Sequence, residues 1–136
     1  MSSQESQERS IPATYTLVSF DIESSEGGRA SWGKNTHGLL IYTVDGHMSV
    51  SINKGVEADP NQRQDLDALF DSILFYAGTY RFDGHIIRHQ VTNASDPARI
   101  GKELIREFRW EGDLLTLTTP KESFGRAILV WRRLGQ

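Results

Sequence analysis

Residues 76–89 read YAGTYRFDGHIIRH. Two runs rich in aromatic and β-branched residues flank the pair Asp83-Gly84, which is a strong short-range signal for a β-hairpin. Successive side chains of a strand point to opposite faces. Folding the stretch about its turn therefore gathers an apolar set with aromatic and histidine tips on one face and a polar set on the other. The stretch predicts an antiparallel hairpin with one buried face.

The same pattern recurs along the chain. Further strand-like runs stand at 15–23, at 38–43 and 47–52 around Val44-Asp45-Gly46, at 102–110 and 113–119 around Glu111-Gly112, and at 127–134. Closing such a sheet on itself removes its exposed edges. We predict an all-β fold, an antiparallel barrel of about eight strands, whose interior is either filled or holds one small ligand.

One segment departs from the strand pattern. Asp59-Pro60-Asn61-Gln62 has an acid at a helix cap, proline at the first helical position and glutamine where a capping box needs it. Leu66, Phe70 and Ile73 follow at helical spacing. We expect one short amphipathic helix at about 60–74 that presents these side chains to the barrel and plugs one end.

Composition limits the class of protein. The 136 residues carry a net charge of −3 and include no cysteine, which excludes disulfides, thiolate catalysis and zinc–sulfur sites. Residues 1–10 hold no large apolar side chain, so we expect a disordered tail before a single domain at 11–136. The absence of a dense basic run, a membrane span and a secretory signal indicates a cytoplasmic protein that binds neither nucleic acid nor membrane.

The turn at Asp83-Gly84 allows facing pairs to be proposed. If Phe82 pairs with His85, the pairs that follow are Tyr80 with Ile87, Gly78 with His89 and Tyr76 with Val91. Gly78 then leaves a gap opposite the imidazole of His89, which is the room that a ligand needs.

The other two hairpins extend the predicted interior. Around Val44-Asp45-Gly46, the pairs are Thr43 with His47, Tyr42 with Met48 and Leu40 with Val50. Around Glu111-Gly112, they are Phe108 with Leu115 and Arg106 with Leu117. Arg106 is unusual on such a face, because a buried guanidinium without a partner is costly. A register slip of one residue would instead turn it outward, toward Glu103 or Glu107.

Several of these stretches resemble one known family, the lipocalin-like domain proteins of bacteria and fungi. The segments that carry the resemblance are 32–34 (WGK), 38–43 (GLLIYT), 45–50 (DGHMSV), 75–80 (FYAGTY) and 112–120 (GDLLTLTTP). The likeness runs from about Thr14 to Leu134. It implies a lipocalin-type barrel with an internal hydrophobic cavity, in a family whose members often occur beside small-molecule biosynthetic enzymes.

The first strand departs from the family pattern. Tyr15 stands where the family commonly has a tryptophan that closes the barrel floor. In lipocalin-type barrels an arginine of the last strand packs over that aromatic residue, and here it is either Arg132 or Arg133.

A largely apolar cavity with a few convergent polar groups is typical of a small-molecule site. His89, with an unperturbed pKa of about 6.5, is the candidate acid or base. Tyr80 and Tyr42 are candidate donors to a carbonyl or enolate oxygen, and Arg106 is the candidate partner of a carbonyl or carboxylate. The remaining candidate ligand contacts are Tyr76, Gly78, Trp32, Met48, Val50, Ile87, Phe108 and Leu117. Alternatively, His89 is a histidine bonded to a tyrosine hydroxyl in a filled barrel, and Trp32 either covers the ligand or packs on the helix.

We expect neither a metal nor a cofactor. His85 and His89 share a face but lie about 13 Å apart along a strand, too far for one ion. The sequence supports a protein that binds a hydrophobic metabolite and catalyses a cofactor-free isomerisation, cyclisation or elimination in natural-product biosynthesis. The alternatives are a carrier that binds without turnover and a filled barrel that serves as an interaction module. The oligomeric state, a homodimer included, stays open.

Overall fold

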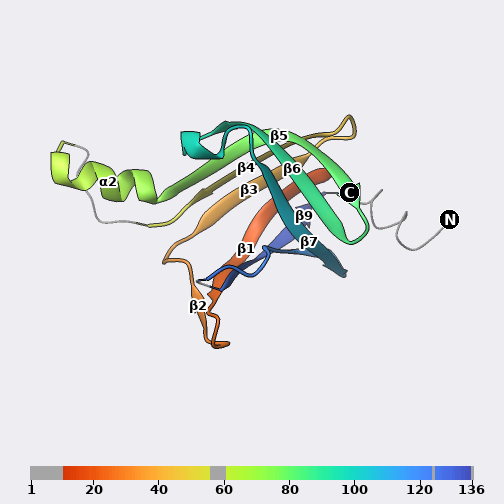
Figure 1. Cartoon of the computed structure of the whole chain (residues 1–136), viewed down its shortest axis with the longest axis horizontal. Helices are drawn as coiled ribbons and strands as arrows, with labels where there is room; N and C mark the ends of the chain where they lie inside the picture. The colour runs from red at the N-terminus through yellow and green to blue at the C-terminus, as the bar shows by residue number, and fades with distance from the viewer. Residues whose placement is uncertain (1–10, 56–60, 124, 136) are drawn as a thin grey trace.

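A computed structural model describes residues 11–55, 61–123 and 125–135 (Figure 1). The tail expected at residues 1–10 and the cap residues Asp59 and Pro60 lie outside this described part. The elements are β1 Ala13–Glu23, β2 Arg29–Ser31, β3 His37–Tyr42, β4 His47–Asn53, α2 Arg63–Asp71, β5 Ile73–Asp83, β6 Ile86–Ala94, the 3-10 turn η1 Pro97–Arg99, β7 Glu103–Glu111, β8 Leu114–Thr118 and β9 Arg126–Leu134.

The strands form a closed antiparallel barrel. They are hydrogen-bonded in the order β2-β1-β3-β4-β5-β6-β7-β8-β9, and β9 also pairs with β1. That closing pair runs from Thr14 opposite Leu134 to Glu23 opposite Arg126. The barrel has eight strands, and the short β2 pairs beside the far end of β1. The predicted all-β barrel is confirmed.

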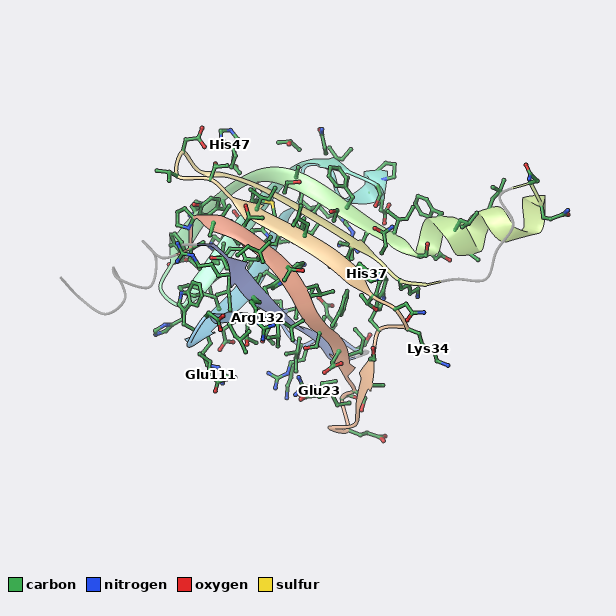
Figure 2. The ribbon with its side chains drawn as sticks, turned by 180° about the vertical axis from the view of Figure 1, so that it is seen from behind. Glu23, Lys34, His37, His47, Glu111 and Arg132 are labelled. Atoms are coloured by element: carbon green, nitrogen blue, oxygen red, sulfur yellow. The ribbon has the colours of Figure 1, made fainter. Side chains whose placement is uncertain are left out.

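Connections between neighbouring antiparallel strands alternate between the two ends of the barrel. The tight turns at 43–46, 84–85 and 112–113 share one end, called here the turn end. The longer connections at 24–36, 54–72, 95–102 and 119–125 share the other, called the loop end. Figure 2 shows His47 and Glu111 toward the turn end and Lys34 and His37 toward the loop end.

Alternation along the strands fills the interior as the sequence predicts. On β4, Met48, Val50 and Ile52 are buried, whereas His47 and Ser51 are exposed. The first hairpin has the predicted register, with Tyr42 opposite Met48 and Leu40 opposite Val50.

The predicted registers of the other two hairpins are wrong by two residues. Phe82 pairs with Ile87 rather than His85, and Phe108 pairs with Leu117 rather than Leu115. The reason is the turn chemistry, since Gly84 (φ 67°) and Gly112 (φ 62°) are the first of two loop residues. A positive φ at that position alone is typical of a type II′ turn. A shift of two residues keeps every side chain on its predicted face.

The space expected beside Gly78 does not exist. Gly78 pairs with Val91, Tyr80 pairs with His89, and an irregularity in the β5–β6 register lies between Ala77 and Gly78. A Cβ atom at Gly78 would collide with the carbonyl oxygen of Gln90. Gly78 is therefore required by the close approach of two backbones and leaves no gap for a ligand.

The helix does not plug the barrel. Helix α2 is shorter than predicted, and both figures show it lying beyond the barrel (Figures 1 and 2). Leu66 and Phe70 remain 49% and 52% exposed. The β4–β5 ladder continues to the pair Asn53–Ile73, and the Lys54 N–H donates to the Ser72 carbonyl. The helix therefore stands at the tip of a long hairpin instead of folding back across the loop end.

Candidate small-molecule site

A cavity of about 360 Å³ occupies the loop-end part of the barrel. This volume lies within the range of roughly 300–1,000 Å³ that is usual for ligand sites. The lining residues are Phe20, Ile22, Trp32, Leu40, Val50, Ile52, Leu74, Tyr76, His89, Arg99, Leu104, Arg106, Leu117, Thr119, Pro120, Glu122, Ala127, Leu129 and Trp131. Most are apolar, and several belong to loop-end connections. The interior is therefore not filled throughout.

Trp32 forms part of the wall near the loop end. It follows β2 and stacks on Phe20 of β1, with ring centroids 4.7 Å apart and planes 10° from parallel. The Lys54 Nζ lies 4.5 Å from the centre of the Trp32 ring, within the range of a cation–π contact. Trp32 thus lines the cavity, and its role as a cover over a bound ligand stays a prediction.

The turn-end part of the barrel is filled by aromatic side chains. We call these the aromatic cluster: Tyr15, Tyr42, Tyr80, Phe82, Phe108 and Trp110. Each ring in it lies within 6.3 Å of another, centroid to centroid. The Tyr80 hydroxyl donates to the Thr43 carbonyl at 2.7 Å, and that of Tyr15 donates to the Ile11 carbonyl. The cluster is thus close-packed, and the polar tips of these two tyrosines are satisfied within the protein.

Tyr15 packs against Arg133 rather than Arg132. Tyr15 is fully buried and lies opposite Arg133 in the β1–β9 ladder. Burial raises the pKa of the Tyr15 hydroxyl well above its ordinary value, and the nearby Arg133 guanidinium opposes that rise. Arg132 points instead to the outer face, where it lies 3.8 Å from Asp113. The tyrosine–arginine contact at the barrel floor thus comes from Arg133.

His89 lies between the aromatic cluster and the cavity. Its imidazole is 1% exposed and bridges two tyrosines, with Tyr42 Oη 2.7 Å from Nε2 and Tyr76 Oη 2.8 Å from Nδ1. β3, β5 and β6 supply the three side chains, each from an inward-facing position. The expectation of a histidine bonded to a tyrosine hydroxyl is confirmed, but the barrel around it is hollow on one side.

Proton counting fixes the direction of these two hydrogen bonds. A neutral imidazole has one N–H donor and one acceptor nitrogen. Tyr42 is buried and lies outside the cavity lining, and its hydroxyl contacts His89 Nε2. A buried donor without an acceptor is costly, so the Tyr42 hydroxyl donates to Nε2. His89 Nδ1 then carries the proton and donates to Tyr76 Oη.

This arrangement leaves the hydroxyl proton of Tyr76 available. Tyr76 lines the cavity, and its hydroxyl oxygen already accepts from His89. The O–H of Tyr76 can therefore donate to a molecule inside the cavity. His89 and Tyr42 hold the phenol in place for that contact.

The ionisation of His89 differs from the prediction. Burial, with a smaller contribution from the Arg106 guanidinium, lowers the pKa of His89 to about 3. Burial also raises the pKa of Tyr42 well above 10. The imidazole is thus neutral near pH 7, and an acid or base role for His89 stays a prediction. In this state His89 orients hydroxyl groups more readily than it accepts a proton from a substrate.

Arg106 faces the interior, as one of the two alternatives predicted. It is half-buried and lines the cavity. Its Nη1 donates to the Ile105 carbonyl at 2.9 Å, and it forms no ion pair with any described residue. Glu103, the alternative partner, pairs with Arg81 and Arg88 on the outer face. The Arg106 guanidinium therefore lines the cavity without an ion-pair partner among the described residues.

Comparison with known proteins identifies the family. The family model for the lipocalin-like domain matches residues 13–134. The chain belongs to this lipocalin-like family. No curated protein matches the chain. Among solved structures, it is similar to a redesigned β-barrel at 6% identity, with 92% of each chain covered and a TM-score of 0.47, a likeness too distant to bear on function.

The lipocalin-like barrel brings about half of the predicted site residues to its cavity. His89 and Arg106 line it, as do Tyr76, Trp32, Val50 and Leu117. Tyr42 and Tyr80 belong to the aromatic cluster, and Tyr42 reaches the cavity only through His89. Gly78, Met48, Ile87 and Phe108 are buried but do not line the cavity.

Sequence reasoning missed much of the loop-end wall. Phe20 and Ile22 on β1, and Leu129 and Trp131 on β9, line the cavity. These residues could have been found from the alternation of inward and outward side chains, by following the inward face of each strand as far as the loop end. Glu122 and other lining residues from loops have no such periodic signal.

Two further findings concern metal binding and membranes. No group of three histidine, aspartate or glutamate side chains is placed to hold a metal ion within the described part of the chain. No helix there is long and apolar enough to span a membrane.

Proposed function

We propose that this lipocalin-like protein binds a small, largely apolar metabolite in its loop-end cavity. The observation that supports this most is the 360 Å³ cavity itself, bordered by aliphatic and aromatic side chains. An empty apolar cavity forfeits dispersion contacts that a bound molecule would restore. The polar side chains Tyr76, His89 and Arg106 would then fix the orientation of the ligand.

A matched pair of substitutions tests the binding site. Val50 lines the cavity, and Ser51, next to it on β4, is exposed on the outer face. We expect the fluorescent apolar probe N-phenyl-1-naphthylamine to bind wild type and Ser51→Phe saturably. Val50→Phe, which fills the cavity, should bind at least about tenfold more weakly, given the cost of overpacking a filled site.

Thermal unfolding of both variants controls for misfolding. Equal probe binding by Val50→Phe and Ser51→Phe, with both folded, would contradict the proposal. So would a failure of the wild-type protein to bind the probe. Native mass spectrometry of the purified protein would report any molecule that co-purifies, and its mass would give the first information on ligand size.

A second candidate function is catalysis by the same cavity. Its support is the hydroxyl proton of Tyr76, which the bond from His89 leaves available, and the Arg106 charge in the same cavity lining. Donors aimed at a developing oxyanion accelerate reactions in dry sites. The candidate reactions are a cofactor-free isomerisation, cyclisation or elimination within a biosynthetic pathway. His89, Tyr42 and Tyr80 would act by positioning, and Arg106 would stabilise negative charge.

Hydrogen exchange next to a carbonyl group separates an enzyme from a carrier. We expect a bound ketone such as 2-decanone to exchange its α-hydrogens in deuterium oxide faster than in buffer, as measured by NMR. Solvent deuteroxide would take the α-proton, and Tyr76 with Arg106 would stabilise the enolate oxygen that forms. Tyr76→Phe should slow this exchange. A wild-type rate equal to that of buffer, for a ketone that binds, would leave the carrier function as the proposal.

A further inference from the structure

Three side chains that line the cavity, Tyr76, Arg106 and Trp131, carry O–H or N–H donors that a ligand could use. We infer that the ligand of this barrel carries a carboxylate, held by the guanidinium of Arg106 and the hydroxyl of Tyr76. This inference rests on the proposed binding function and assigns the chemical class of the ligand. The remaining, apolar part of such a molecule would occupy the aliphatic region of the cavity.

Arg106 supplies the charge. A guanidinium that is partly withdrawn from water is stabilised by a carboxylate, and bidentate pairing is its preferred geometry. Five other arginines form ion pairs with carboxylates on the outer face or at its edge, among the described residues. They are Arg29, Arg81, Arg88, Arg126 and Arg132, and Arg88 contacts two carboxylates. Arg106 has no such partner among the described residues, although it faces the cavity.

Tyr76 supplies an aligned donor. Its hydroxyl oxygen accepts from His89 Nδ1, so its proton points away from the imidazole and has no acceptor among the described residues. The bond from Tyr42 to His89 Nε2 fixes the imidazole in this role. Hydrogen bonds to a charged acceptor are stronger than those between neutral groups. A carboxylate has two acceptor oxygens, which suits a guanidinium and a hydroxyl that line the same cavity.

Trp131 gives an independent indication of a missing acceptor. Its side chain is 1% exposed and lines the cavity, and its Nε1 has no hydrogen-bond partner within the described part of the chain. Buried polar atoms are satisfied in the large majority of cases, so an orphaned donor in a cavity wall indicates an absent acceptor. This donor favours a ligand rich in acceptor oxygens.

The charges along the cavity agree with an anionic ligand. Arg99 and Arg106 line it together with one carboxylate, Glu122, which is exposed and belongs to the β8–β9 connection. Glu122 therefore lies where water screens it, whereas Arg106 lies on a strand and is half-buried. The more buried charge is the positive one.

Three molecules with one scaffold test the inference. They are 2-naphthoate, its methyl ester and 2-methylnaphthalene, which share the ring but lose first the charge and then the carbonyl group. Their affinities are measured at pH 7.5 by displacement of N-phenyl-1-naphthylamine. We expect wild type to bind the carboxylate at least about tenfold more tightly than the ester, as for a hydrogen-bonded charged group.

Substitutions identify the side chain that causes the preference for the carboxylate. Arg106→Met should bring the ratio of carboxylate affinity to ester affinity close to one, and Arg106→Lys should retain part of the preference. Arg109→Met is the matched control, because Arg109 lies on the same strand but is exposed. Tyr76→Phe should weaken the binding of the carboxylate and of the ester several-fold, and should leave the affinity for 2-methylnaphthalene unchanged.

The outcomes separate the two proposals. If the fluorescent probe binds but wild type does not prefer the carboxylate, or if the preference survives in Arg106→Met, the carboxylate assignment is overturned and the binding function stands. If the probe itself does not bind, the binding function is overturned. Should Arg106→Met fail to fold, the wild-type ratio and Arg106→Lys decide the question.

Discussion

At the turn end of the barrel, Tyr42 and Phe108 lie against other aromatic rings, whereas at the loop end Val50 and Leu117 lie against a cavity. Both ends are built from the same strands with the same alternation of inward and outward side chains. They differ in how the inward side chains pack and in the connections. At the turn end, aromatic rings contact one another between tight turns, whereas at the loop end aliphatic and aromatic side chains with long connections surround open space.

The two ends also differ in how their polar groups are satisfied. The hydroxyls of Tyr15 and Tyr80 donate to backbone carbonyls within the aromatic cluster. Around the cavity, Trp131 Nε1 has no partner within the described residues, and Arg106 has no carboxylate there. The two hydroxyls at the turn end are thus satisfied within the protein, whereas the Trp131 donor at the loop end is not. This difference supports the proposed binding function.

The largest expected effect comes from removing one phenylalanine at each end. Phe108 is 3% exposed within the aromatic cluster, and Phe20 is 7% exposed and stacks on Trp32 at the cavity wall. Phe108→Ala should lower the free energy of unfolding by about 3–5 kcal/mol, because close-packed surroundings cannot collapse into the space. Phe20→Ala should cost at least about 1 kcal/mol less, since its surroundings are already incomplete.

Urea denaturation of both variants at one pH measures the contrast. Circular dichroism confirms that each variant keeps its β-structure before unfolding. Equal losses for Phe108→Ala and Phe20→Ala would show that the cavity wall is as tightly packed as the aromatic cluster, and would remove the distinction between the two ends.

The pH dependence of stability tests whether His89, which lies between the aromatic cluster and the cavity, is shielded from water. Burial lowers the pKa of His89 to about 3 in the folded protein, against about 6.5 for an unperturbed histidine. Between these values the unfolded chain binds a proton that the folded protein does not. The contribution of His89 is therefore full above pH 6.5 and is lost as the pH falls toward 3, by about 1.4 kcal/mol per pH unit.

Comparison with a variant isolates this effect from other titrating groups. Between pH 7.5 and 5, wild type should lose about 2 kcal/mol more than His89→Gln, which cannot titrate there. His47→Gln, which replaces an exposed imidazole at a tight turn, should behave as wild type. If His89→Gln loses as much unfolding free energy per pH unit as wild type, water reaches the imidazole through the cavity and His89 is not shielded.

The sequence predicts the architecture well because that depends on alternation and glycine turns. The inward positions of Val50, His89 and Arg106 follow from the period of the strands and survive a register error of two residues. The family resemblance pointed to the same barrel, and the match over residues 13–134 confirms it.

The cavity itself was predicted for a wrong reason. The sequence reasoning placed it beside Gly78, where the backbone of Gln90 leaves no room. Packing around a glycine depends on how closely strands approach, which a bulge alters and the residue pattern does not reveal. The helix was placed wrongly for a similar reason, since an apolar stripe such as Leu66 and Phe70 does not say which surface, if any, it covers. The pKa of His89 depends on burial on all sides, which only the assembled barrel determines.

The smallest expected contrast lies within the pair of tyrosines that hold His89. Tyr42→Phe leaves Nε2 without a donor on the dry side, and should cost about 1–3 kcal/mol of unfolding free energy. Tyr76→Phe leaves the Nδ1 proton facing the cavity, where water can accept it, and should cost on the order of 1 kcal/mol less. Urea denaturation at pH 7.5 gives both values, and the ¹⁵N shifts of His89 report which nitrogen carries the proton. A larger loss for Tyr76→Phe, with the proton on Nε2, would reverse the direction of both hydrogen bonds. The free hydroxyl proton would then belong to Tyr42, inside the aromatic cluster, and the donor offered to the cavity would have to be Arg106 or Trp131 alone.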